Sequence, residues 1–174
     1  IALKDGRTLV IRDAVPDDAA AIFVYLEAIS GESDFLTFGP GEFELNEAQE
    51  AAYLRAVNAA PDQFYVIGTI DRAIVASLAF SPGKRQRTRH VGEFALAVRA
   101  ACWGLGSGEM LLDVLLDWAR ASGTVSKIAL RVRTDNARGI ALYRRLGFVT
   151  EGTLRREICV RGEYYDLFYM GLLL

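Results

Sequence analysis

The sequence has few residues of the kinds that build metal or disulfide sites. Its 174 residues include two cysteines, Cys102 and Cys159, and a single histidine, His90. Structural zinc sites need clustered Cys and His ligands, so we expect no metal. A chain of this length buries about two-thirds of the surface that its unfolded form exposes. The core therefore needs neither a metal ion nor a disulfide bond.

Long apolar runs are also missing. A membrane-spanning helix needs about 18 consecutive apolar residues, whereas the longest run here, AIVASLAF at residues 73–80, has the length of a strand. The N-terminus shows no basic region followed by an apolar signal core. We therefore expect a cytoplasmic protein with no membrane partner.

The net charge of −2 hides two opposite parts. Residues 1–80 hold 5 Lys and Arg against 13 Asp and Glu, and residues 81–174 hold 15 against 9, which gives net charges of −8 and +6. This asymmetry predicts that the second part binds something anionic and the first part faces a neutral or cationic group. Chance composition of the surface is the alternative. The basic loop at 82–89 contains no aromatic residue for base stacking, which argues against a nucleic-acid partner.

Hydrophobic periodicity and turn residues predict the elements. We expect strands at 8–13, 63–69, 73–81, 91–98, 127–132, 148–155 and 164–172, and helices from 15–18 to 30, at 46–58, 106–122 and 136–146. An apolar loop without periodicity, residues 31–44, separates the first two helices. The strand–helix–strand order after residue 91 implies parallel neighbouring strands. The predicted fold class is mixed α/β, or α+β in a stricter scheme, with a single domain over residues 1–174.

The sequence WGLGSG at residues 103–108 lies between an apolar strand and an amphipathic helix. Its glycines remove Cβ atoms where a ligand approaches the backbone, and the helix start offers unpaired N–H groups and a positive dipole end. This pattern predicts a phosphate cradle, with a plain glycine-rich turn as the alternative. A dinucleotide fingerprint would need glycine in place of Glu109, and a Walker loop would need Gly-Lys-Ser/Thr.

A second pattern, NARGIALYRRLGF, covers residues 136–148. It predicts a helix that begins at Asn136 and ends at Gly147, with Tyr143 on the same face as Asn136. Each residue also has a structural explanation: Asn136 as a helix cap, and Tyr143 as a half-buried core aromatic.

The two patterns together resemble the GNAT superfamily of acetyl-CoA-dependent N-acetyltransferases, bacterial type. The resemblance covers nearly the whole chain and is strongest over residues 91–148. The superfamily usually has Gln or Arg where this chain has Trp103. Because the backbone donors of the loop do not depend on that side chain, we expect pyrophosphate binding to survive.

The resemblance implies a mostly antiparallel sheet with a central parallel strand pair flanked by helices. It also implies acetyl-CoA as cosubstrate, a core of about 91–148 that binds it, and an N-terminal part that faces the acceptor. Tyr143 would donate a proton to the departing coenzyme A thiolate. The implied acetyl-CoA contacts are Leu96, Ala97 and Val98 and Asn136 for the pantetheine arm, and Trp103, Gly104, Leu105, Gly106, Ser107 and Gly108 for the pyrophosphate, with Arg131, Arg133, Arg138, Arg144 and Arg145 favouring the anion.

The acceptor is predicted less sharply. An alkylamine with a pKa near ~10.4 arrives protonated and must lose a proton before it attacks. Glu93 is the candidate base, with an outward-facing strand charge as the alternative. Candidate acceptors are small amines such as polyamines, amino acids or aminoglycosides, and an N-terminus or lysine of a protein. Four acids of the apolar loop would suit a cationic acceptor or be merely solvated: Glu32, Asp34, Glu42 and Glu44.

Two function classes follow from the sequence. The first is an N-acetyltransferase that moves the acetyl group directly to a primary amine, in a superfamily where homodimers are common. The second is a non-catalytic acyl-CoA-binding sensor or interaction module of the same fold. Tyr143 discriminates between them, because a module that only binds needs no proton donor at the sulfur.

Overall fold

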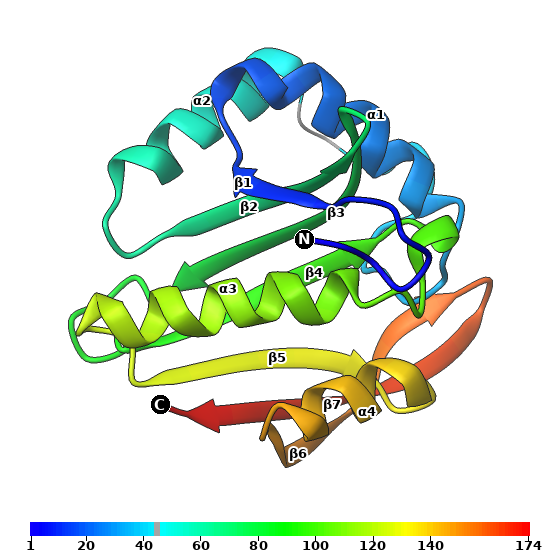
Figure 1. Cartoon of the computed structure of the whole chain (residues 1–174). Coiled ribbons are helices and arrows are strands. Elements are labelled where there is room, and N and C mark those ends of the chain that lie inside the picture. The colour runs from blue at the N-terminus through cyan, green and yellow to red at the C-terminus, as the bar shows by residue number, and fades with distance from the viewer. Residues whose placement is uncertain (44–45) are drawn as a thin grey trace.

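The computed structural model describes residues 1–43 and 46–174. Seven strands form one sheet in the order β1-β2-β3-β4-β5-β7-β6 (Figure 1). The strands are β1 (Val10–Asp13), β2 (Phe64–Ile70), β3 (Ala73–Pro82), β4 (Val91–Val98), β5 (Lys127–Arg133), β6 (Val149–Val160) and β7 (Glu163–Leu173). The helices are α1 (Ala19–Ser30), α2 (Glu47–Ala59), α3 (Ser107–Ser122) and α4 (Ala137–Arg145), with 3-10 helices η1 (Pro16–Asp18) and η2 (Ala100–Cys102).

The strand pairing confirms the predicted fold class. β4 and β5 run parallel, and the other neighbouring strands run antiparallel. α3 is the crossover that connects the parallel pair, as the strand–helix–strand order requires. In the part of the chain that the structure describes, no helix has the length and apolarity that a membrane span needs.

Side-chain hydrogen bonds to backbone N–H groups fix the points at which the N-terminal helices begin. Asn46 accepts a hydrogen bond from the Gln49 N–H at 3.0 Å, and the Gln49 side chain accepts one from the Asn46 N–H at 2.9 Å. This reciprocal capping fixes the first turn of α2. α1 begins at Ala19, slightly later than predicted, because Pro16 opens a separate 3-10 turn that the Asp18 carboxylate closes by accepting from the Val15 N–H at 2.9 Å.

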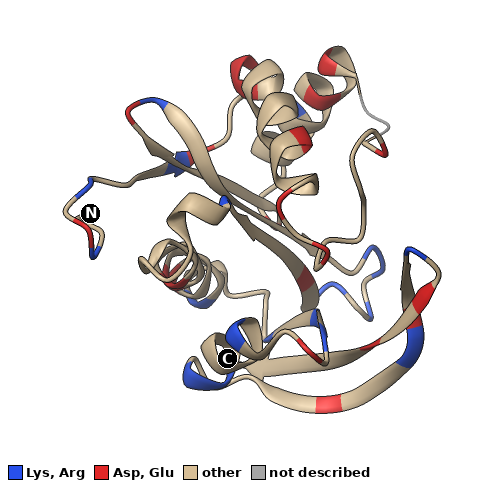
Figure 2. Cartoon of the chain, turned by 90° about the vertical axis from the view of Figure 1, so that its right-hand side faces the viewer, with Lys and Arg blue, Asp and Glu red and all other residues tan. Residues whose placement is uncertain are grey.

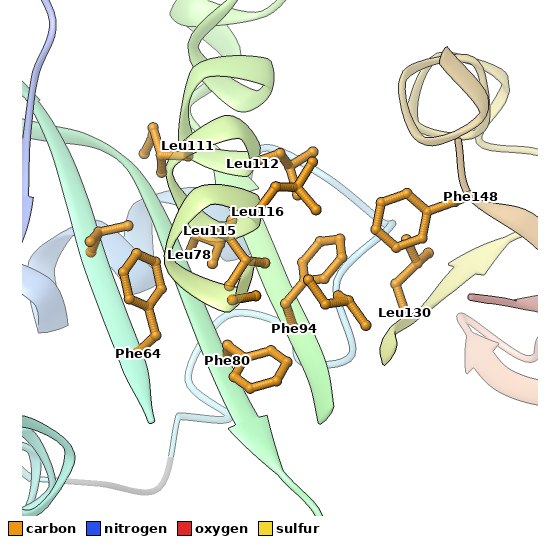
Figure 3. Packing of buried hydrophobic residues seen from close by; sticks show 14 of the residues in the cluster. Phe64, Leu78, Phe80, Phe94, Leu111, Leu112, Leu115, Leu116, Leu130 and Phe148 are labelled. Carbon is orange, nitrogen blue, oxygen red and sulfur yellow. The ribbon is translucent and has the colours of Figure 1, made fainter. Parts of the chain in front are cut away.

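Two apolar layers cover the sheet. On one face, α3 places Leu111, Leu112 and Leu115 against Leu78 and Phe80, all nearly inaccessible to solvent (Figure 3). Each such side chain contributes roughly 1.5–3 kcal/mol through its removal from water. On the other face, α1 and α2 pack on the alternate side chains of β2 and β3. The part of the sheet formed by β2 and β3 is thus buried on both sides, and the side chains of these strands alternate between the two layers.

β6 extends further than predicted, to Val160 instead of 155. Residues 149–160 lie at the edge of the sheet and are mostly exposed, so they lack the alternating apolar pattern that marks a half-buried strand. Two irregularities in its pairing with β7 bend the hairpin. At the hairpin tip Arg161 contacts both carboxylate oxygens of Asp34 at 2.6 and 2.7 Å, which ties β6 and β7 to the loop after α1 (Figure 1).

Candidate active site between the diverging strands

The site begins where β4 and β5 separate. The two strands pair only from Val91 to Glu93, opposite Lys127 to Ala129. Beyond this point β4 keeps its partner β3, with the Arg99 N–H donating to the Val75 carbonyl at 2.8 Å. Because backbone groups alternate in direction along a strand, the N–H and C=O groups of Leu96 and Val98 point into the gap on the β5 side.

A cavity of about 830 Å³ occupies this gap and continues under α1 and α2. One end is lined by β4, the glycine-rich loop of residues 103–108 (the glycine loop) and α4. The other end is lined by α1, the apolar loop of residues 31–44 that follows it, α2, β2 and β3. Of the predicted site residues, the cavity is lined by Glu93, Leu96, Ala97, Val98, Trp103, Gly104, Gly106, Ser107, Gly108, Asn136 and Tyr143. The fold therefore brings two patterns about 30 residues apart in the sequence to one cleft.

The glycine loop has the conformation of an anion cradle. Gly104 and Gly106 have φ angles of +78° and +101°, which L residues rarely adopt. The first backbone hydrogen bond of α3 runs from the Met110 N–H to the Gly106 carbonyl at 3.0 Å, which leaves the preceding N–H groups free to face a ligand. Ser107 is buried, and its hydroxyl oxygen has no hydrogen-bond partner among the described residues. These unpaired groups at a helix N-terminus fit a bound phosphate.

Basic side chains surround this end of the cavity. Lys4, Arg138 and Arg145 line it. The helix α4 carries basic residues, whereas the N-terminal helices α1 and α2 carry mostly acidic ones (Figure 2). The Arg138 guanidinium lies over the Trp103 ring at 4.1 Å, and the Trp103 indole N–H donates to the Val98 carbonyl at 2.7 Å. Trp103 thus connects the end of β4 to α4. Its side chain holds the loop in place without using the loop's backbone donors.

Tyr143 lies on α4 against two other aromatic rings. Its ring centroid is 5.8 Å from that of Phe94 and 6.0 Å from that of Phe148, both edge to face. Burial raises the pKa of Tyr143 to about 12, so its hydroxyl keeps its proton over the physiological pH range. Tyr143 thus packs in the core, as its structural explanation predicts, and also lines the cavity.

Asn136 caps α4, because its side-chain oxygen accepts from the Gly139 N–H at 3.0 Å. The residue also lines the cavity. Ala97 lies on β4 beside Leu96 and Val98, but its backbone faces β3, and its carbonyl accepts a hydrogen bond from the Tyr25 hydroxyl at 2.7 Å. Ala97 nevertheless lines the cavity.

Glu93 lies on the α1–α2 face of the sheet, at the point where β4 and β5 separate. One carboxylate oxygen lies 3.3 Å from the Arg131 Nε, and the side chain is 44% exposed. Arg131 also approaches Glu157 at 3.7 Å. Glu93 therefore combines an outward, ion-paired position with a place in the cavity lining.

The acids of the apolar loop are used within the protein. Glu32 accepts from the Arg99 Nε and the Ala100 N–H, each at 2.7 Å, and Glu42 accepts from the Gly39 N–H at 2.6 Å. Asp34 pairs with Arg161, as described above. None of these three acids lines the cavity, and Glu44 lies outside the described residues. A positive charge on the acceptor must therefore be met elsewhere.

Two cavity-lining acids, Glu50 and Glu109, did not appear among the sequence candidates, and Glu50 is the buried one. Glu50 in α2 is 2% exposed, and its Oε1 has no hydrogen-bond partner among the described residues. Burial raises the pKa of its carboxyl group above the ordinary value of 4.5. The sequence does contain a signal, because Glu50 precedes Tyr53 and Leu54 by three and four residues and so shares their apolar helix face.

The comparisons with known proteins agree with this geometry. The profile of the acetyltransferase (GNAT) family matches residues 26–148. The chain belongs to this family. The family and the fold class predicted from the sequence are thereby confirmed.

Two curated relatives and two solved structures are similar to it. The L-amino acid N-acetyltransferase AaaT of Escherichia coli is 30% identical over 61% of this chain and 65% of its own length. The N-alpha-acetyltransferase RimI of Mycobacterium tuberculosis is 35% identical over 64% of this chain and 68% of its own. The alignments thus span about two-thirds of each relative.

A GNAT acetyltransferase from Streptococcus pneumoniae has a TM-score of 0.92 and 29% identity over 96% of this chain and 99% of its own. YncA from Salmonella typhimurium, solved with its cofactor acetyl-CoA, has a TM-score of 0.83 and 22% identity over 96% of this chain and 94% of its own. Acetyl-CoA is therefore bound by a protein of the same fold.

Proposed function

We propose that this protein transfers the acetyl group of acetyl-CoA directly to a primary amine. The observation that carries the proposal is the divergence of β4 and β5 beside the start of α3. It exposes the backbone of Leu96 and Val98 next to the free N–H groups of the glycine loop, within one cavity. Acetyl-CoA would supply the acetyl thioester, and the protein's own groups would bind it, orient it and move protons.

The end of the cleft that is lined by β4, the glycine loop and α4, called the cofactor end below, would bind and orient acetyl-CoA. The N–H groups of Leu96 and Val98 and the Leu96 carbonyl would pair with the amide groups of the pantetheine arm, as a missing strand would, while the Val98 carbonyl accepts from Trp103. An N–H of β4 aimed at the thioester carbonyl would stabilise the oxyanion that forms during transfer. The N–H groups at residues 105–108 would bind the pyrophosphate, with Lys4 and Arg138 adding positive charge.

Two side chains would move protons. Tyr143, whose raised pKa keeps its hydroxyl protonated, would donate its proton to the coenzyme A sulfur as the C–S bond breaks. Glu93 would accept the proton that the incoming amine must lose, directly or through water. Its position in the cavity lining, at the point where β4 and β5 separate, supports this role.

The acceptor we propose is a small molecule. AaaT acts on L-amino acids and RimI is an N-alpha-acetyltransferase, as their names state, so both transfer to an amino group. The cavity here continues from the gap into a recess under α1 and α2 with mostly apolar walls. A recess of this kind suits a compact amine better than an extended polypeptide.

The test is a panel of primary amines incubated with the protein and acetyl-CoA. We expect coenzyme A release that depends on the amine, with one acetylated amine formed per coenzyme A. Acetyl-CoA binding without release over a broad panel, including peptide N-termini, would contradict the proposal and favour a sensor. Acetylation of peptides alone would contradict the small-molecule acceptor.

A further inference from the structure

We propose that the acceptor end of the cleft is a binding site for a hydrophobic organic ammonium ion, with Glu50 as its counter-charge. The inference rests on the proposed function for its biological meaning. Glu50 belongs to neither of the two sequence patterns and has no role in the acetyl transfer proposed above.

Glu50 differs from the other acids that line the cavity. Three acidic residues of the described chain do so, namely Glu50, Glu93 and Glu109. Glu93 lies 3.3 Å from Arg131, and Glu109 lies 2.8 Å from Arg145. Glu50 makes no ion pair with a described residue, although it is by far the most buried of the three. A buried carboxylate without a partner is costly, and a cationic ligand would remove that cost.

The fold supports a negative charge at this position. Glu50 lies near the N-terminus of α2, where the helix dipole favours an anion. Burial raises the pKa of Tyr65, and the nearby Glu50 carboxylate raises it further. Burial also raises the pKa of Tyr53, and the Glu50 carboxylate adds a smaller contribution to that rise. The faces of these two tyrosine rings, with centroids 6.3 Å apart, can also attract a cation.

The walls around Glu50 define the rest of the ligand. They are mainly apolar or aromatic, with Ser33, Thr37 and Ser77 as polar members and Arg133 over the Phe35 ring. The apolar and aromatic side chains come from α1, the loop after it, α2 and β2. The side chains are Leu26, Ile29, Phe35, Leu36, Phe38, Phe43, Tyr53 and Tyr65. Such walls gain from covering apolar surface, so the ligand would be an alkyl or aryl amine. A polyol or a polyanion would leave polar groups facing these rings.

The cavity leads from Glu50 past Tyr65 and two alanines to the gap between β4 and β5. Tyr65 on β2 lies opposite Ala79 on β3, and Ala79 lies opposite Ala95 on β4. All three lie on the α1–α2 side of the sheet and line the same cavity. Neighbouring strands are ~4.8 Å apart, so an ammonium group paired with Glu50 lies about two strand spacings from the diverging edge of β4. The amine that reacts at that edge is therefore a second amino group of the same ligand.

The experiment measures binding of 2-phenylethylamine and of its uncharged isostere 2-phenylethanol by calorimetry at pH 7.5, with coenzyme A present so that no turnover occurs. We expect the wild type to bind the amine more tightly than the alcohol. Glu50→Gln should weaken amine binding at least tenfold and leave alcohol binding unchanged. Because Oε1 has no partner to lose, this variant should fold, which circular dichroism checks.

Glu47→Gln is the matched control. It removes the same charge from the same helix, one turn earlier, at an exposed position, and should bind the amine like the wild type. Equal amine affinities in Glu50→Gln and the wild type would overturn the inference. So would equal weakening in Glu47→Gln, which would indicate a long-range field. Because the readout is binding, loss of acetyl transfer would defeat the proposed function without affecting this test.

Discussion

The two ends of the cleft are built by different means. At the cofactor end, the ligand-facing groups are mainly backbone N–H and C=O groups, placed by the divergence of β4 and β5 and by two left-handed glycines. At the acceptor end they are side chains that converge from α1, the apolar loop, α2 and two strands. A site built from backbone groups depends little on side-chain identity, whereas a site built from convergent side chains depends on the identity of each residue.

The largest effect should follow from a change to the glycine loop. Gly106→Asp places a carboxylate among N–H groups that would otherwise face a phosphate, so acetyl-CoA affinity should fall at least 100-fold. Calorimetric titration with acetyl-CoA measures this. Gly123→Asp is the control, because Gly123 ends the same helix with a φ of +64° and no neighbour within 4 Å. It introduces the same charge and similar strain, and should bind acetyl-CoA normally.

If both aspartate variants lost acetyl-CoA equally, damage to α3 would explain the result, and the cradle would not. If neither lost it, the cofactor end would lie elsewhere. Either result would break the distinction between the two ends of the cleft.

The next effect concerns the chemistry at the cofactor end. Tyr143→Phe keeps the ring that packs on Phe94 and Phe148 and removes only the hydroxyl. We expect kcat to fall at least tenfold, with acetyl-CoA affinity changed less than twofold. Steady-state rates of coenzyme A release and a binding titration check the two parts. An unchanged kcat would remove Tyr143 from the role of acid.

The smallest effect concerns stability at the acceptor end. Because the pKa of Glu50 is raised in the folded protein, the folded state binds its proton more tightly than the unfolded state does. The penalty is absent below the ordinary pKa of 4.5, grows as the pH rises to the folded-state value, and is constant above it. Glu50→Gln should therefore melt higher than the wild type at pH 7.5, by roughly 2–4 °C per kcal/mol gained, and no higher at acidic pH.

Thermal melts of both proteins between pH 4 and pH 8 test this prediction. A gap that is independent of pH would show that the carboxylate charge is not the cause. A saturating hydrophobic amine should narrow the gap at pH 7.5 by stabilising only the wild type.

The cofactor end can be predicted from the sequence because its determinants are local. Gly104 and Gly106 stand in one short glycine-rich stretch, and Asn136 and Tyr143 lie within one helical pattern. The separation of β4 from β5 depends on pairing between distant segments, and no local pattern indicates that Ala97 turns its backbone away from the gap.

The acceptor end is harder to predict for the same reason. Composition marks Glu32 and Asp34 as exposed acids of an apolar loop, but their partners Arg99 and Arg161 come from distant parts of the chain. Glu50 is easily overlooked because a lone acid in a helix is usually solvated. Its position beside Tyr53 and Leu54 on the apolar face is the available signal.

Steady-state kinetics with one hydrophobic diamine, compared between Tyr143→Phe and Glu50→Gln, test the division of the cleft most directly. If the two ends act as described, Tyr143→Phe lowers kcat at least tenfold and leaves the KM for the amine within twofold. Glu50→Gln then raises that KM at least tenfold, with a much smaller change in kcat. Changes of the same size in the same parameter for both variants would contradict the division.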